Sequence, residues 1–313
     1  MSVAATEHRS GKLAVADQAM VLACIDIGSN TTRLLVADAG KGRLRELASQ
    51  RAFTRIGKGL LEGGAIPPEK VAETAEVVTT QARVARELGA NEIVAVATAA
   101  IRDAPNRDEL AAAVEDAGGM PLWILSGDEE ARLAFVGATR TLATPVEGPV
   151  AVVDVGGGST ELAIGVPDGT VEWSVSFSMG SGFLADAYLR SDPPSAAELE
   201  TVRRHVWGTV EGLSAPPARS AVAVGGTATS LRRLVGAELA HETLERGVRV
   251  LAASPIAEVA ERFDLDPERI RLLPAGILVL EAFSDLLELP LRIARGGLRE
   301  GALLELIDAR GED

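Results

Sequence analysis

The stretch Ile25-Asp26-Ile27-Gly28-Ser29-Asn30-Thr31-Thr32-Arg33-Leu34 decides the fold, because residues 153–162 repeat its pattern as Val-Asp-Val-Gly-Gly-Gly-Ser-Thr-Glu-Leu. The two stretches align without a gap. Each reads aliphatic, Asp, aliphatic and Gly, then two small or polar residues, two hydroxyl residues, a charged residue and Leu. One such hairpin pattern is a weak signal. Two in register, one opening each half of the chain, indicate duplicated domains that face each other across a cleft.

The pattern of apolar residues around these stretches predicts an α/β fold. Three strands open the first half, at Val21–Ile27, Arg33–Ala39 and Leu44–Phe53, and three open the second, at Val150–Val155, Glu161–Val166 and Thr170–Phe177. Helices that alternate with strands follow each set, which is typical of an α/β sheet. The predicted helices include Pro67–Leu88, Asp128–Thr141, one from about Thr227, Pro274–Leu289 and Leu298–Ala309. With a proline-containing boundary at 145–149, we expect a tail over residues 1–20 and domains over 21–145 and 146–297.

Composition limits the classes of partner. The 313 residues suggest about two domains, and a 47% hydrophobic content is enough for a proper core. The formal net charge of −14 argues against nucleic acid and membranes, because a surface that binds polyanions is normally basic. The charge is uneven, since residues 1–110 hold 14 basic and 14 acidic side chains and residues 111–313 hold 17 and 31.

Cysteine and histidine usage excludes several chemistries. The single cysteine, Cys24, rules out an internal disulfide and a cysteine-rich zinc site. The three histidines lie outside the motifs, so catalysis by histidine has no support. Residues 1–19 contain no apolar segment typical of a secretory signal, and no predicted helix is a membrane span. We therefore expect a cytoplasmic protein.

The second hairpin has the residues of a phosphate site. Gly156, Gly157 and Gly158 allow backbone N–H groups to approach a ligand closely and form an anion-binding concavity, to which Ser159 adds a hydroxyl donor. Asp154 ends the preceding strand, where a carboxylate suits Mg²⁺, and Glu161 faces either the cleft or solvent. A plain turn is the alternative, but three glycines and two hydroxyls exceed what a turn needs. The matching first hairpin adds Ser29, Asn30 and Thr31 as phosphate-binding candidates.

A helix start supplies the candidate general base. In the stretch Ser126-Gly127-Asp128-Glu129-Glu130, Ser126 and Glu129 have the spacing of a capping box. Asp128 also favours the positive end of the helix dipole. This leaves Glu130 without a structural task, although one more dipole-favoured acid is the alternative. Phosphoryl hydrolysis needs a group that orients or deprotonates water, so Glu130 is the predicted base.

Two further motifs are candidate phosphate contacts. Arg102 follows a buried strand, and it could either grip phosphate oxygens or pair with Asp103 at the surface. Gly226 and Thr227 follow another strand at a predicted helix start, where free N–H groups bind anions. A tight strand–helix connection is the alternative there. The chain has no Walker A, dinucleotide-binding or serine-hydrolase motif.

Seven segments together resemble the exopolyphosphatase / guanosine pentaphosphate phosphatase family: IDIGSNTTRLLVAD (25–38), ATAAIRD (97–103), ILSGDEEARLAF (124–135), VVDVGGGSTELAIG (152–165), FSMGSG (177–182), AVGGTATSL (223–231) and GGLREGALL (296–304). They fall in the family's order over residues 21–304. The resemblance implies two ribonuclease-H-like domains of the actin, sugar-kinase and heat-shock-ATPase superfamily. It also implies that the last helix, 298–309, returns to pack on the first domain. Longer members of that family have an additional C-terminal helical domain, and we expect this chain to be a short, two-domain member.

The resemblance also implies roles for residues. It makes Glu130 the catalytic glutamate, and it places metal and phosphate binding on Asp154, Gly156, Gly157, Gly158, Ser159 and Glu161. Ser29, Asn30 and Arg102 match phosphate-binding positions. The implied cofactor is Mg²⁺, with Mn²⁺ as the alternative.

The expected reaction is Mg²⁺-dependent release of orthophosphate from the end of inorganic polyphosphate by a monomer or homodimer. Hydrolysis of guanosine pentaphosphate (pppGpp) shares every motif and stays the main alternative. A superfamily kinase or ATPase and a silent alarmone-binding sensor are more remote. We expect a polyphosphate tail to leave along the first domain, past Arg33, Arg55, Lys58, Arg102 and Arg107.

Overall fold

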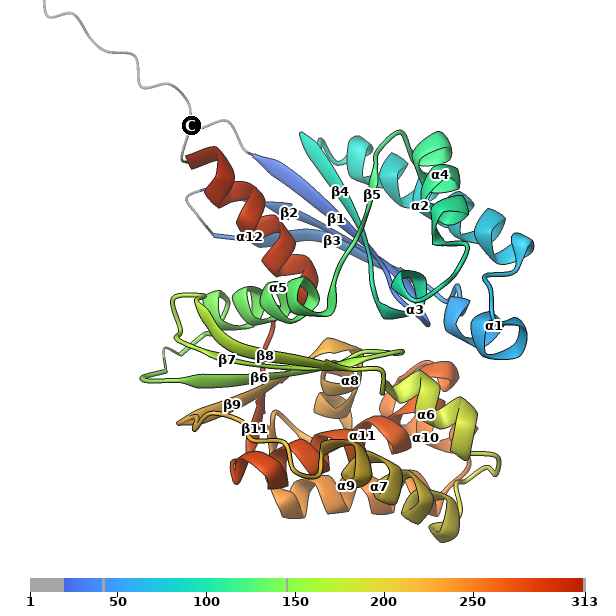
Figure 1. Cartoon of the computed structure of the whole chain (residues 1–313), viewed down its shortest axis with the longest axis vertical. Helices are drawn as coiled ribbons and strands as arrows, with labels where there is room; N and C mark the ends of the chain where they lie inside the picture. The colour runs from blue at the N-terminus through green and yellow to red at the C-terminus, as the bar shows by residue number, and fades with distance from the viewer. Residues whose placement is uncertain (1–19, 41–42, 145, 312–313) are drawn as a thin grey trace, which may run out of the picture.

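The computed structural model describes residues 20–40, 43–144 and 146–311, which form two β-sheets flanked by helices (Figure 1). The first sheet has the strand order β3-β2-β1-β4-β5, with β1 (Val21–Ile27), β2 (Thr32–Asp38), β3 (Arg45–Ala52), β4 (Glu92–Ala97) and β5 (Leu122–Ile124). β1, β2 and β3 are antiparallel, whereas β4 runs parallel to β1. The three-strand start and the α/β class are as predicted.

The second sheet repeats this plan in the second half of the chain. Its strand order is β10-β11-β9-β6-β7-β8, with β6 (Val150–Val155), β7 (Thr160–Gly165), β8 (Val171–Phe177), β9 (Ser220–Val224), β10 (Glu238–Leu239) and β11 (Leu291–Ile293). β6, β7 and β8 are antiparallel, and β9 runs parallel to β6. The mixed α/β fold with two similar sheets confirms the predicted fold class.

The central strands are buried because helices cover both faces of each sheet. Every residue of β6 is buried, as are six of the seven residues of β1. Continuous aliphatic runs of this kind are typical of strands covered on both sides. In the first half, α2 (Pro68–Glu87) and α4 (Arg107–Gly118) supply Val78, Ala82, Leu110 and Val114 to the core on one face.

On one face of the second sheet, six helices pack together to form a core. α6 (Ser181–Tyr188), α7 (Ala196–Val210), α8 (Gly225–Val235), α9 (His241–Ala253), α10 (Ile256–Phe263) and α11 (Pro267–Leu287) contribute to this core. α11 is its centre, because fifteen of its residues are buried and it packs on α6, α7, α8, α9 and α10. The core of the second half is therefore built around one long buried helix.

Two helices connect the halves. α5 (Gly127–Arg140) lies between the two sheets in Figure 1; its Leu133 packs in the core of the first half and its Phe135 in that of the second. α12 (Leu298–Gly311) packs closely on α5 and on β1, and its Leu303 is fully buried. A Cβ on Gly301 would collide with the carbonyl oxygen of Leu133, so this helix crossing requires glycine.

Several helices begin or lie where the sequence did not predict them. α11 begins at Pro267, so Pro274 lies inside the helix, where the surrounding core compensates for its missing N–H. α8 begins at Gly225, two residues before Thr227. α1 (Ile56–Gly63), α3 (Ala99–Arg102) and α9 were not predicted. α1 holds Gly57 and Gly59, although glycine has a low helix propensity. A Cβ on Gly57 would lie 3.2 Å from the Cβ of Ser29, so a larger residue would require movement there.

Two expectations concern the chain as a whole. Residues 1–19 of the predicted tail lie outside the described residues. Within the part that is described, none of the helices combines the length and the apolar character that crossing a membrane requires.

Candidate active site

The two hairpins meet at a cavity of about 750 Å³ between the halves of the molecule. The turns have the same hydrogen bond: the Gly28 N–H donates to the Thr31 carbonyl and the Gly156 N–H to the Ser159 carbonyl, each over 3.0 Å. The repeat in the sequence therefore corresponds to a repeat in backbone geometry. The predicted phosphate-binding residues that line the cavity are Ser29, Asn30, Thr31, Gly156, Gly157, Gly158, Ser159 and Gly226.

The hairpins approach each other closely, and glycine makes this possible. A Cβ on Gly158 would collide with the Ser29 hydroxyl, and one on Gly157 would lie 3.2 Å from the Cβ of Asn30. Ser29 Oγ and Asn30 Nδ2 are buried and have no hydrogen-bond partner among the described residues. Buried donors without partners are costly, and an anion between the hairpins would satisfy them. This supports a phosphate position at the hairpins.

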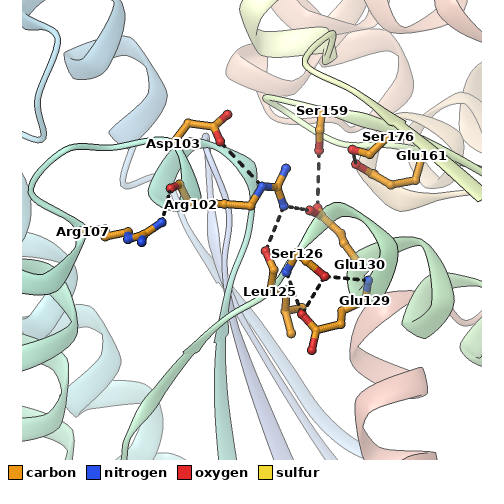
Figure 2. Close-up of polar contacts among 10 residues, drawn as sticks. All are labelled: Arg102, Asp103, Arg107, Leu125, Ser126, Glu129, Glu130, Ser159, Glu161 and Ser176. Carbon is orange, nitrogen blue, oxygen red and sulfur yellow. Dashed lines mark hydrogen bonds and ion pairs between the residues drawn. The ribbon is translucent and has the colours of Figure 1, made fainter.

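Glu130 lies on the first turn of α5, where the capping box positions it (Figure 2). Ser126 Oγ accepts a hydrogen bond from the Glu129 N–H over 3.2 Å, and Glu129 Oε2 accepts one from the Ser126 N–H over 2.8 Å. The predicted capping box is therefore confirmed. It occupies Glu129 and leaves the adjacent Glu130 pointing into the cavity with only 6% of its surface exposed.

The surroundings of Glu130 bring its pKa to the range of a general base. Burial raises the pKa of Glu130 to about 7, against the opposing effect of Arg102. Arg102 Nη1 donates to Glu130 Oε2 over 3.0 Å and to the Leu125 carbonyl over 3.0 Å (Figure 2). On the other side, the Ser159 hydroxyl lies 3.4 Å from Glu130 Oε1. A base with a pKa near 7 is half ionised at neutral pH, which suits proton abstraction from water.

Two predicted phosphate contacts are not among the lining residues of the cavity. Arg102 instead holds Glu130, and its Nε lies 3.7 Å from Asp103. The pairing of Arg102 with Asp103 is therefore present, and contact of Arg102 with phosphate stays a prediction. Thr227 is 1% exposed, and its side chain packs against Gly276 of α11, where a Cβ would lie 2.7 Å from Thr227 Oγ1. Thr227 therefore supports the helix packing behind Gly226.

The predicted metal ligands form an excess of buried negative charge. Asp154 and Glu161 are directly opposite each other on β6 and β7, with 9% and 2% of their surfaces exposed. The Ser176 hydroxyl donates to Glu161 Oε1 over 2.8 Å. Burial raises the pKa of Asp154 to about 6, and burial together with Glu130 and Asp154 raises the pKa of Glu161 well above its usual range. A cation beside these carboxylates would relieve both effects.

The donor set fits Mg²⁺ better than a metal that requires a full protein cage. No group of three or more His, Cys, Asp or Glu side chains in residues 20–40, 43–144 and 146–311 is arranged to hold a metal ion. Mg²⁺ keeps several waters and uses one or two carboxylates together with phosphate oxygens. Gly225 brings the start of α8 against Asp154; its φ of +85° and the collision that a Cβ would have with Asp154 Oδ1 both require glycine.

Two arginines also line the cavity: Arg33, which was expected along the substrate route, and Arg269, which the sequence motifs did not single out. Arg269 of α11 is 5% exposed, and its Nε and Nη2 have no hydrogen-bond partner among the described residues. A Cβ on Gly226 would lie 2.5 Å from Arg269 Nη1 and 3.0 Å from Arg33 Nη2. Burial, with like charges nearby, lowers the pKa of Arg33 to about 10 and that of Arg269 to about 9. The half-buried Arg33 and the buried Arg269 lie at a helix N-terminus, an arrangement that suits an anion.

Sequence reasoning missed Arg269 because it placed the helix start at Pro274. The correct helix start was indicated in the sequence by Asp266-Pro267, since Asp266 caps the helix and Pro267 is its first residue. The other basic residues of the predicted substrate route lie outside the large cavity. Arg55 pairs with Glu268 of α11 over 3.1 Å, and Lys58 lines a separate cavity of about 330 Å³.

Arg107 donates to the carbonyl of Arg102 over 3.0 Å (Figure 2). Of the five cations expected along the route, only Arg33 lines the large cavity.

Comparison with known proteins relates the chain to a family of phosphatases. The sequence model of the Ppx/GppA phosphatase family matches residues 35–310. Exopolyphosphatase 2 of Mycobacterium tuberculosis is 32% identical over 288 residues, covering 84% of this chain and 89% of that protein. Exopolyphosphatase 1 of the same organism is 31% identical over 311 residues, covering 94% and 90%.

Solved structures agree with the sequence comparison. The crystal structure of the Aquifex aeolicus member of the Ppx/GppA protein family has a TM-score of 0.79 at 27% identity, covering 93% of this chain and 98% of that one. An exopolyphosphatase from Cytophaga hutchinsonii has a TM-score of 0.83 at 20% identity, covering 93% and 98%, which shows a shared fold.

Proposed function

The chain belongs to the Ppx/GppA phosphatase family, and from this premise we propose that it is a Mg²⁺-dependent exopolyphosphatase. Its homologues make it a phosphatase of the hydrolase class. One observation carries the finer proposal. Glu130, a buried carboxylate with a pKa near neutrality, faces a glycine-hairpin anion site in a cavity that Arg33 and the unpaired Arg269 also line. Such a site suits a linear polyanion with its reactive end at the hairpins.

The reaction follows from the positions of the chain's own groups. The terminal phosphate lies between the hairpins, where backbone N–H groups, the Ser29 hydroxyl and the Asn30 amide donate to its oxygens. Glu130 accepts a proton from a water molecule as the water oxygen forms a bond to the terminal phosphorus. The phosphorus–oxygen bond to the next unit breaks, and the shortened chain leaves with that oxygen and its electron pair. Arg102 keeps the Glu130 carboxylate oriented during this step.

The internal phosphates extend toward Arg33 and Arg269. Their guanidiniums hold the leaving chain in place, which aligns it with the attacking water. Because phosphoryl transfer depends mainly on positioning and on stabilising charge, this alignment is a large part of the catalytic effect. The polyanion in turn relieves the repulsion between the guanidiniums of Arg33 and Arg269.

Asp154, with Glu161 beside it, would hold Mg²⁺ next to the hairpins. When bound, Mg²⁺ neutralises charge that develops on the phosphoryl oxygens. The raised pKa values of both carboxylates fit this role, because ionised acids in this position need a cation. Mn²⁺ has the same ligand preferences and is the alternative.

Hydrolysis of pppGpp to ppGpp is the second candidate. The cavity of about 750 Å³ is within the size range of sites for small organic ligands, so it could also hold a nucleotide. The catalytic groups would act in the same way on the terminal phosphate of that substrate. The two candidates therefore differ only in what occupies the cavity beyond the hairpins.

Parallel phosphate-release assays with inorganic polyphosphate of several lengths and with pppGpp test the proposal. We expect polyphosphate to be hydrolysed with the higher kcat/KM, and Glu130→Gln to abolish most of the release from both substrates. Activity on pppGpp alone would replace the first candidate by the second. Transfer of phosphate to an acceptor other than water would overturn both.

A further inference from the structure

A row of charged residues crosses the first sheet at the cavity. Asp26, Arg33 and Arg51 are directly opposite one another on β1, β2 and β3. Cross-strand neighbours have Cβ atoms about 4.5–5.5 Å apart, and like charges in such positions are destabilising. Asp26 can offset the charge of only one of the two arginines. Asp154 adds to the negative charge near Arg33, so Arg51, whose cross-strand neighbour is Arg33, is the arginine that has no acid opposite it.

The structure holds Arg51 in place without neutralising it. Its guanidinium lies 5.3 Å from the centre of the Phe53 ring, a cation–π contact that leaves the charge intact. Arg51 is exposed, lines the large cavity, and lies near enough to Arg33 and Arg269 to lower the pKa of both. The three arginines thus form a group that starts at the buried Arg269 and ends at the cavity mouth.

A fourth arginine lies in another part of the cavity wall. Arg295 is exposed in the loop between β11 and α12, and it also lines the cavity. In the part of the chain that the structure describes, neither Arg51 nor Arg295 forms an ion pair or a hydrogen bond. By contrast, Nη1 of Arg299 in the same wall donates to the Leu34 carbonyl over 3.0 Å and to Ser49 Oγ over 3.3 Å, so part of this guanidinium is already engaged.

We propose that Arg51 and Arg295 form an outer phosphate subsite that makes affinity depend on the length of the substrate chain. This inference rests on the proposed function and extends it. A chain of three phosphates is held by the hairpins and by Arg33 with Arg269, and it ends there. A longer chain continues past these residues to the mouth, where two exposed guanidiniums that form no ion pair or side-chain hydrogen bond accept its next units. Length is thus recognised at the mouth, at a distance from the reacting phosphate.

The experiment compares inorganic triphosphate with long-chain polyphosphate on Arg51→Gln, Arg295→Gln and the double variant. Charge-assisted hydrogen bonds to phosphate predict that each substitution raises KM for the long chain by roughly 3–10-fold. The effects should multiply in the double variant, while kcat changes little and the constants for triphosphate stay within about twofold. Arg204→Gln is the matched control, because Arg204 is an exposed arginine of α7 that does not line the cavity.

A binding measurement separates this inference from the proposed reaction. In a Glu130→Gln background, the affinities for triphosphate and for long-chain polyphosphate are measured over a range of salt concentrations. We expect the double variant to weaken long-chain binding selectively and to flatten its salt dependence, since fewer counterions are released from the polyanion. Failure of wild-type protein to hydrolyse polyphosphate would reject the proposed function, and the binding result would still decide the subsite.

Three outcomes would overturn the subsite. Equal losses for triphosphate and the long chain would show a general effect on the cavity. Unchanged long-chain affinity in the double variant would show that the two arginines do not contact substrate. An equal effect of Arg204→Gln would show that only net charge matters.

Discussion

Replacing Arg102 by Met should move the acid limb of the pH–rate profile upward while leaving the chemistry intact. Arg102 donates to Glu130 over 3.0 Å, and both its hydrogen bond and its charge lower the pKa of Glu130 against the larger effect of burial. Glu130 must be ionised to accept a proton. Without the guanidinium, the carboxylate becomes ionised only at higher pH.

The size of the shift follows from the burial of the pair. The side chains of Arg102 and Glu130 are 20% and 7% exposed, so solvent screens their interaction only in part. A hydrogen bond to a charged group contributes about 1.5–3 kcal/mol, and about 1.36 kcal/mol corresponds to one pH unit. Starting from a pKa of about 7, the limb should move to roughly pH 8–9. At pH 7 the ionised fraction, and with it the rate, should fall roughly 5–50-fold.

The assay is kcat/KM for phosphate release from polyphosphate between pH 5 and pH 10, because this ratio reports groups of the free enzyme. Arg102→Met should regain most of its activity at high pH. Glu130→Gln should stay roughly 10²–10⁴-fold below wild type at every pH. Arg107→Met is the control, since Arg107 donates to the Arg102 carbonyl and does not contact Glu130. An Arg102→Met profile with an unmoved acid limb would refute the role of this pair.

Three other changes test separate parts of the structure. Glu130→Gln should raise the free energy of unfolding by roughly 1–3 kcal/mol at pH 8 and hardly at pH 4. The pKa of Glu130 is raised from 4.5 to about 7 in the folded state, so ionisation of the carboxyl destabilises that state as the pH rises through this window. Equal denaturation curves for the variant and wild type at pH 8 would contradict this. Gly301→Ala should destabilise the folded protein by about 1–3 kcal/mol, since its Cβ would collide with Leu133. Gly208→Ala in α7 meets open space and should stabilise the folded protein by up to about 1 kcal/mol. Thermal unfolding of both variants measures this difference. EDTA should abolish hydrolysis, and Asp154→Asn should raise the Mg²⁺ concentration for half-maximal activity at least roughly tenfold; an unchanged Mg²⁺ titration would remove Asp154 from the metal site.

The local patterns of the sequence predicted most of the framework. Strands such as 21–27 and 150–155 match the structure to the residue, because short aliphatic runs bounded by polar turns have few alternatives. The capping box was equally predictable, since it depends on residues only three positions apart. Because the capping box uses Glu129, it leaves the adjacent Glu130 as the acid without a structural role.

The parts that failed depend on contacts between distant segments. Pro274 marks a helix start by local rules, but in the structure it is buried in the middle of α11. The hydrogen bond from Arg102 to Glu130 was not predicted, because no local signal connects residues 28 positions apart; contact of Arg102 with phosphate stays a prediction. Arg269 could not be assigned because its neighbours in the cavity, Arg33 and Gly226, come from other strands and helices.

The duplicated hairpin explains how an acidic chain can hold a polyanion. The same three positions across the two sheets carry Asp26, Arg33 and Arg51 in the first half and Asp154, Glu161 and Ser176 in the second. Duplication supplies the same strand geometry twice. The middle position is the positively charged Arg33 in the first half and the negatively charged Glu161 in the second, so the two rows suit ligands of opposite charge. The acidic row suits a cation, and the basic row suits the phosphates that such a cation would accompany. The net charge of −14 is therefore no guide to binding here, because the field within the cavity is set by these two opposed rows.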